Sequence, residues 1–142
     1  MVTILSGLIG GLLATIVMTV FMMALGDDSP PPTAALWAKY VGDGPADDYV
    51  MPGMVLHLLY GVGAGAVFVL AVPAIGFGLD GVVAAVAAGV VFALVLTVVG
   101  MVFWMNVVLA MDAAPKTMAM FGVFHLVYGV VLGGVVGAGV LG

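Results

Sequence analysis

The chain has 142 residues, 65% of them hydrophobic and 6% charged, with seven Asp, two Lys and no Glu, Arg or Cys. Because a soluble domain carries roughly 25% charged residues and would aggregate with so much exposed apolar surface, this composition excludes a soluble fold and predicts one membrane domain. The shortage of basic residues argues against nucleic-acid partners, the absence of Cys excludes disulfides and thiolate-bound metals, and the acidic balance favours a halophilic host such as a halophilic archaeon.

Four stretches are apolar and long enough to cross about 30 Å of hydrocarbon, which takes roughly 20 helical residues. We therefore predict an all-α integral membrane protein with four transmembrane helices, a multi-pass protein of the cell membrane. The first stretch has no basic N-terminal region and is longer than the apolar core of a signal peptide, so it is predicted to be a retained span. The predicted helices cover residues 4–25, 52–72, 81–106 and 117–141.

Three prolines and one aspartate mark the predicted helix ends. Pro52 and Pro115 stand at the starts of the second and fourth helices, where a proline is tolerated because the N–H that it lacks would be unpaired. Pro73 is expected to end the second helix, since a proline cannot donate to the preceding turn. Asp80 is expected to cap the third helix.

The longest polar segment is the first connection, and it contains a short helical stretch at about residues 33–41. This stretch carries Trp37, Lys39 and Tyr40. Because Trp and Tyr favour the headgroup layer, it is predicted to be an interfacial helix that lies on the membrane. The alternative is an ordered loop that caps the helix bundle.

Both lysines fall in connections that lie on the same side of the membrane. Lys39 is in the first connection and Lys116 in the third. Cytoplasmic loops carry an excess of Lys and Arg, so these connections are predicted to be cytoplasmic and both termini to be outside.

The string His-Leu-x-Tyr-Gly occurs twice, at residues 57–61 and 125–129, and holds the only two histidines of the chain. In the partner helices, the positions of Gly11, Thr19 and Met23 match those of Gly89, Thr97 and Met101 at a constant offset. Chance duplication around the only histidines is improbable, so we predict two tandem two-helix repeats. The second and fourth helices would then run parallel, related by a pseudo-two-fold axis along the membrane normal.

Each histidine heads a strip of glycines spaced four residues apart, which share one helix face. Such strips let membrane helices approach closely, so the glycines are predicted to pack helices together or to face another copy of the chain. The predicted structural residues are Tyr60, Gly61, Gly65, Tyr128, Gly129, Gly133 and Gly137.

An ionisable residue inside a membrane is a functional hypothesis by default, and His57 and His125 admit three readings. In the first, each neutral imidazole hydrogen-bonds to a neighbour, fixes the bundle and binds no cofactor. In the second, the two imidazoles are the axial ligands of a haem b. A haem between the two helices would force them beyond their usual separation of about 8–10 Å, which argues against this reading. We therefore predict no cofactor, as in the first reading, and keep haem b bound by both histidines as the alternative.

A soft-metal site is a third reading, because the chain has 11 Met, and thioether and imidazole ligands suit Cu(I). Two pairs have helical i,i+4 spacing, Met18 with Met22 and Met101 with Met105, and Met54 lies one turn before the first histidine. Methionine is also an ordinary filler of apolar helices. Copper binding or transport therefore stands as a further alternative.

Short motifs of the first half resemble families of small four-helix membrane proteins, among them the YagU-like inner-membrane proteins and relatives in halophilic archaea. The motifs are Ala14-Thr15-x-x-Met18-Thr19, the proline run at residues 30–32 and the first His-x-x-Tyr-Gly string. The resemblance implies a four-helix membrane architecture. It implies no activity, because these families carry no assigned reaction.

No carboxylate or lysine lies in a predicted span, which argues against proton pumps and ion channels. The spans also offer no base at helical spacing from Ser6, so hydrolysis is unsupported. We therefore predict a small non-catalytic membrane protein, a structural or accessory subunit of a larger membrane complex or a homo-oligomer. Its expected surroundings are the lipid bilayer and other membrane subunits.

Overall fold

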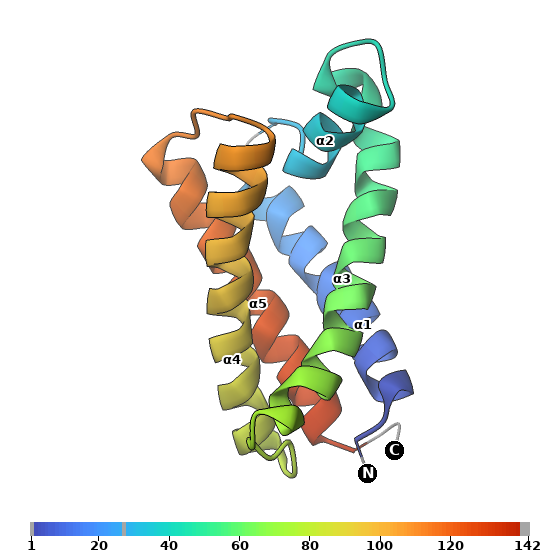
Figure 1. Ribbon diagram of the computed structural model, residues 1–142, viewed down its shortest axis with the longest axis vertical. Coiled ribbons are helices and arrows are strands. Elements are labelled where there is room, and N and C mark those ends of the chain that lie inside the picture. The colour runs from blue at the N-terminus through green and yellow to red at the C-terminus, as the bar shows by residue number, and fades with distance from the viewer. Residues whose placement is uncertain (1, 27, 140–142) are drawn as a thin grey trace.

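The computed structural model describes residues 2–26 and 28–139. Within these residues the protein is all-helical, and four helices are long and apolar enough to cross a membrane, as the composition predicts. Two short helices join the first span to the second (Figure 1). The elements in chain order are α1 (Ile4–Leu25), α2 (Pro32–Tyr40), η1 (Ala46–Tyr49), α3 (Val50–Ala74), α4 (Val82–Val99), the π-helical segment η2 (Gly100–Val108) and α5 (Pro115–Gly137).

The four long helices alternate in direction along the bundle (Figure 1). Helices α1 and α4 run toward the end that carries α2, and α3 and α5 run away from it. The parallel course predicted for the second and fourth helices is therefore present. Helix α2 is a true helix that lies across this end of the bundle and packs against α3, where Ala34 is wholly buried against Gly53.

Two helix starts follow from their local sequence. The Thr3 hydroxyl accepts a hydrogen bond from the Ser6 backbone N–H at 3.1 Å, and the Ser6 hydroxyl accepts one from the Thr3 N–H at 3.0 Å. This reciprocal capping box satisfies donors that a helix start otherwise leaves unpaired. Helix α5 begins with Pro115 in its first turn, as its missing N–H allows.

Other helix ends differ from the sequence predictions. Helix α3 begins two residues before Pro52 and continues through Pro73 to Ala74, because a proline in the last turn removes only one bond before the helix ends. Asp80 does not cap α4. Gly81 takes the N-cap position with a φ of 91°, a conformation that favours glycine, and the cap has no side-chain hydrogen bond.

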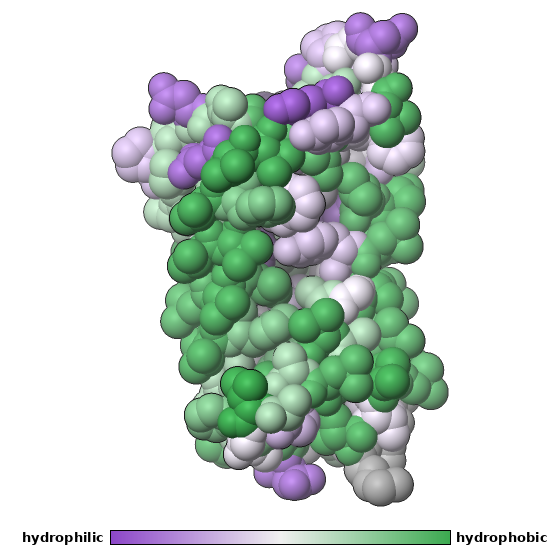
Figure 2. All heavy atoms as spheres, in the orientation of Figure 1, coloured by the Kyte–Doolittle hydropathy of each residue, from purple (hydrophilic) through white to green (hydrophobic). Residues whose placement is uncertain are grey.

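Most apolar side chains of the four spans point outward rather than into a core. Met23 and Val83, for example, are 83% and 85% exposed. Figure 2 shows polar residues gathered at the two ends of the molecule and a broad apolar band between them. Helices that are apolar on every side are stable only in a hydrophobic surrounding, so the band matches a lipid bilayer.

The helices form two closely packed pairs, α1 with α3 and α4 with α5. A Cβ added to Gly11 would lie 2.5 Å from the Gly61 carbonyl oxygen, so only hydrogen fits there. In the other pair, Gly89 and Gly129 each abut the other's carbonyl group in the same way. Glycine thus brings the backbones of each pair into direct contact.

The two pairs meet along α1 and α5, whereas α3 and α4 make few contacts. The Tyr128 hydroxyl of α5 reaches across to donate a hydrogen bond to the Gly61 carbonyl oxygen of α3 at 2.6 Å. The buried cluster at this junction contains Ala14, Met18, Ala64, Phe68, Val69, Val72, Leu79, Ala85, Phe124, Tyr128, Leu132 and Val136. The separation of α3 from α4 leaves a space that the rest of the fold surrounds.

Candidate functional site

A cavity of about 210 Å³ lies between α3 and the α4–η2 helix, in the half of the bundle nearer α2. Helix α1 and helix α5 form its other walls, and the start of α2 closes its end. No Asp or Lys is among its lining residues. Those residues are Met18, Met22, Pro31, Pro32, Thr33, Leu36, Leu56, His57, Tyr60, Gly61, Ala64, Leu96, Gly100, Trp104, Met105, Leu109, Phe121, Phe124, His125 and Tyr128.

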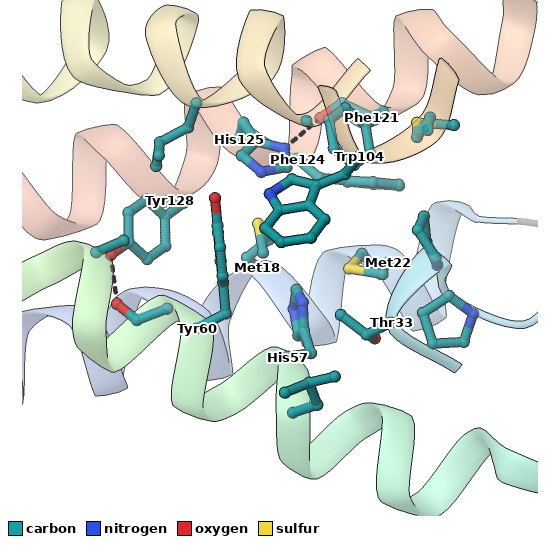
Figure 3. Close-up of a pocket in the computed structure, with 18 of the residues that line it drawn as sticks. Met18, Met22, Thr33, His57, Tyr60, Trp104, Phe121, Phe124, His125 and Tyr128 are labelled. Atoms are coloured by element: carbon teal, nitrogen blue, oxygen red, sulfur yellow. Dashed lines mark hydrogen bonds between the residues drawn. The ribbon is translucent and has the colours of Figure 1, made fainter. Parts of the chain in front are cut away.

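Both histidines line this one cavity, from helices that are far apart in the sequence. Figure 3 shows His57 on α3 and His125 on α5 directed into the space from opposite walls. Helices α3 and α5 run parallel (Figure 1), and Figure 3 shows the two histidines at similar depth along them. An apolar pocket with a few converging polar groups is the usual form of a small-molecule site.

The hydrogen bond of His125 fixes which of its nitrogens carries hydrogen. Its Nδ1 lies 2.8 Å from the Phe121 carbonyl oxygen, one turn earlier on α5, and its ring lies 4.3 Å from the Phe121 ring, centroid to centroid. A carbonyl oxygen only accepts, so Nδ1 is the donor. In the neutral imidazole, Nε2 is then left with a lone pair for an acceptor or ligand role.

His57 has no such anchor. Its Nε2 is buried and has no hydrogen-bond partner among the described residues. The Thr33 hydroxyl, also on the cavity wall, is in the same state. A buried polar group without a partner destabilises a protein by about 1–3 kcal/mol, so two at one cavity mark a site where a ligand would restore the missing bonds.

The two tyrosines of the repeated string also differ, since one has a hydrogen-bond partner and the other has none within the described part of the chain. Tyr128 is 2% exposed and bonded to Gly61. Tyr60 is 40% exposed and packs edge-on against Trp104, with ring centroids 6.5 Å apart. Trp104 belongs to η2, and Figure 3 shows its indole beside the cavity, with the Phe124 side chain on the α5 wall. Aromatic rings therefore form much of the boundary of the cavity.

The π-helical segment shapes the wall that faces α3. Its wide turn is visible in the Leu109 N–H, which donates to the Trp104 carbonyl oxygen five residues earlier at 2.9 Å. Gly100 opens this segment, and a Cβ added there would lie 2.5 Å from the Phe121 ring. The Lys39 amine of α2 donates to the Val108 carbonyl oxygen at its other end. Single π turns are frequent at functional sites.

The predicted residues fall into two groups in the structure. His57, His125, Tyr60, Gly61 and Tyr128 line the cavity. Outside the cavity lining, the remaining predicted glycines serve helix packing against α1 or α4, and these are Gly65, Gly129, Gly133 and Gly137.

The methionines divide similarly. Met18 and Met22 of α1 and Met105 of η2 line the cavity, whereas Met54 and Met101 do not. The i,i+4 pair at Met101 and Met105 is therefore split between two environments, because the π-helical turn changes which residues share a face.

Sequence reasoning missed Thr33 and Trp104 as cavity residues. The sequence places Thr33 directly after a proline run and predicts its segment at the membrane surface rather than at a cavity wall. Trp104 is the only tryptophan in a long helix, which was the available signal.

No protein-family model, curated protein or solved structure matches this chain. The resemblance to the YagU-like proteins therefore stays a prediction, and the function has to be argued from the cavity.

Proposed function

We propose that this chain is a small non-catalytic membrane protein that holds a lipid-soluble small molecule in the cavity between α3 and the α4–η2 helix. The observation that carries the proposal is the buried, unpartnered Nε2 of His57 in a cavity lined by apolar and aromatic side chains. The cavity adjoins the outer surface between α3 and α4, where a paler, less apolar patch interrupts the apolar band (Figure 2). A molecule dissolved in the bilayer would reach it from the side.

Photolabelling with a phenyl diazirine, a small apolar aromatic probe, tests this proposal in native membranes. We expect the label on cavity residues such as Trp104 and Met105 to exceed that on lipid-facing residues. Leu96→Phe should fill part of the cavity and lower this label at least threefold. The matched variant Leu94→Phe should leave it unchanged, because Leu94 is 50% exposed on the outer face of the same helix. Equal labelling in both variants would refute cavity binding.

A bis-histidine haem b is the second candidate, because both imidazoles line one cavity. The volume argues against it. A cavity of about 150 Å³ holds a single benzene, so about 210 Å³ suits one or two rings rather than a tetrapyrrole. A Soret band in the purified protein, lost in His57→Leu, would establish haem in place of the small molecule.

A soft metal is the third candidate, since three thioethers and two imidazoles line the cavity. Metal analysis of the same preparation, before and after exposure to Cu(I), tests it directly. Stoichiometric copper that is lost in both Met18→Leu and Met22→Leu would establish this reading.

The accessory role and the internal duplication belong to the same proposal. Support for duplication comes from matching contacts, because Gly11 abuts Gly61 in one pair and Gly89 abuts Gly129 in the other. Gly61 and Gly129 are the equivalent glycines of the repeated string. The large exposed apolar faces suit either lipid or partner subunits. Native mass spectrometry from nanodiscs would test for a homo-oligomer or a stoichiometric larger complex.

The orientation proposal places the end with α2 in the cytoplasm and both chain ends outside. Lys39 and Lys116 lie at that same end of the bundle, which supports it. The chain has no cysteine, so Asp47→Cys and Val2→Cys provide single labels on opposite sides. A membrane-impermeant maleimide applied to intact cells should label the Val2 position alone; the reverse pattern would invert the topology.

A further inference from the structure

We infer that the ligand of this cavity is a lipid-soluble hydroquinone, a ring with two hydroxyl groups at opposite ends and a long apolar tail. This inference rests on the proposed function and narrows it to one ligand class. Four observations carry it: the size of the cavity, the hydrogen-bonding state of its two imidazoles, its aromatic walls and a groove that leads away from it.

Size limits the ligand to a small ring system. The cavity holds about 210 Å³ and carries no charged side chain. A dry cavity of about 150 Å³ accommodates one benzene ring, so one substituted ring or two fused rings fit here. Trp104 and Phe124 offer faces and edges against which such a ring can pack.

The two imidazoles require a ligand with polar groups on opposite sides. His125 presents a lone pair at Nε2, because its Nδ1–H is already donated to the Phe121 carbonyl oxygen. His57 presents an unpartnered Nε2 that donates or accepts according to its tautomer. A hydroquinone hydroxyl can donate to His125 while the second hydroxyl bonds to His57. A quinone carbonyl cannot donate to His125, so the reduced ring is the better match.

A groove explains where the tail lies. It runs beneath α2 and adjoins the cavity, sharing Leu36, Leu56 and Trp104 with it. Its remaining lining is apolar or aromatic, namely Trp37, Tyr40, Val41, Phe103 and Val108. A hydrocarbon chain fits such a surface, and the polar ring is thereby directed toward the histidines rather than toward the groove.

The test uses the full chain in nanodiscs with Trp37→Phe, which leaves Trp104 as the only tryptophan and places it at the cavity. Decylhydroquinone, decylquinone and decylbenzene are titrated under anaerobic conditions, and binding is followed by the Trp104 fluorescence. We expect decylhydroquinone to bind at least tenfold more tightly than decylbenzene. His57→Leu and His125→Leu should each weaken it roughly five- to tenfold, the effect of one hydrogen bond, and leave decylbenzene unaffected.

The outcomes separate this inference from the proposed function. If decylbenzene and decylhydroquinone bind equally, or if neither histidine variant matters, the ring oxygens are not recognised and the hydroquinone is refuted, while cavity binding stands. If decylquinone binds more tightly than decylhydroquinone, the acceptor role of His125 is refuted. If none of the three binds and the diazirine label is also absent, the proposed function fails. His57→Gln, which keeps an amide donor and acceptor, should retain part of the hydroquinone affinity.

Discussion

The two helix pairs each carry the string His-Leu-x-Tyr-Gly, yet its side chains have different surroundings in each pair. In the α4–α5 pair, His125 is anchored to Phe121 and Tyr128 is buried and bonded to Gly61. In the α1–α3 pair, the Nε2 of His57 has no partner and Tyr60 is half-exposed. The glycine contacts within the two pairs nevertheless match.

The cause of this difference is the way in which the pairs are joined. Helix α1 packs against α5, but α3 does not pack against α4 in the same manner, and the cavity lies where that contact is missing. The histidine and tyrosine with hydrogen bonds belong to α5, which packs against α1. The histidine and tyrosine without them among the described residues belong to α3, which faces the cavity. The close packing within each pair is therefore shared, and the cavity comes from the departure from symmetry.

The largest expected effect comes from breaking the packing that the two pairs share. A Cβ at Gly65 or Gly129 would collide with the backbone of the neighbouring helix. Gly65→Val and Gly129→Val should therefore each destabilise the protein by about 3 kcal/mol or prevent folding. Gly63 and Gly134 lie on the same helices with open space around them, so Gly63→Val and Gly134→Val are the controls.

Thermal unfolding in detergent, followed by circular dichroism, measures this effect. The controls should stay close to the unsubstituted chain, because an added Cβ meets nothing within 4 Å at either position. A Gly65→Val protein as stable as its Gly63→Val control would show that the α1–α3 contact is not as close as described.

The tyrosines provide the next comparison. Tyr128→Phe removes a buried hydrogen bond of 2.6 Å to Gly61 and leaves that carbonyl oxygen without its interhelical donor. It should destabilise the protein by about 1–2 kcal/mol. Tyr60→Phe should change stability by less than about 0.5 kcal/mol, because no hydrogen bond holds its half-exposed ring. Chemical unfolding of both variants in one detergent checks the order, and equal losses would contradict the asymmetry.

The histidines sharpen the comparison, because the same substitution should destabilise the protein at one histidine and not at the other. His125→Leu loses the bond to the Phe121 carbonyl oxygen and should destabilise the ligand-free protein by about 1 kcal/mol. His57→Leu removes an unpartnered buried nitrogen, so it should be neutral or slightly stabilising. Unfolding midpoints of delipidated protein measure both. A destabilisation by His57→Leu as large as that by His125→Leu would refute the unanchored state of His57.

Much of this architecture could be predicted from sequence, because the membrane imposes it. Twenty apolar residues per span define the four helices, and a glycine every fourth residue defines the face that packs. The repeated string correctly pointed to two parallel helices with His57 and His125 at similar depth. These features depend on local periodicity, which a sequence displays directly.

The cavity could not be predicted in the same way, because it depends on which helices meet. Nothing in the α1 or α4 sequence indicates that α1 contacts α5 while α4 stays apart from α3. The π-helical turn at Gly100–Val108, which moves Met105 and Trp104 to the cavity, also has no periodic signal. The sequence predicts Thr33 in a surface helix, because its hydroxyl becomes buried through the packing of α2 on the bundle.

The smallest expected effect concerns a hydrogen bond by which α2 links the two pairs. Lys39 lies in α2, between α1 and α3 in the chain. Its amine donates a hydrogen bond to the Val108 carbonyl oxygen at the end of η2, which belongs to the α4–α5 pair. A lysine near a helix C-terminus stabilises it by about 0.5 kcal/mol, so Lys39→Met should reduce stability only slightly. It should, however, free α2 to move from the cavity end, and hydrogen exchange of the α2 amides should rise. Lys116→Met, in the first turn of α5 and outside the cavity lining, should leave that exchange unchanged. If the two variants exchange alike, α2 is held by its contacts with α3 alone, and the cavity end does not depend on the second pair.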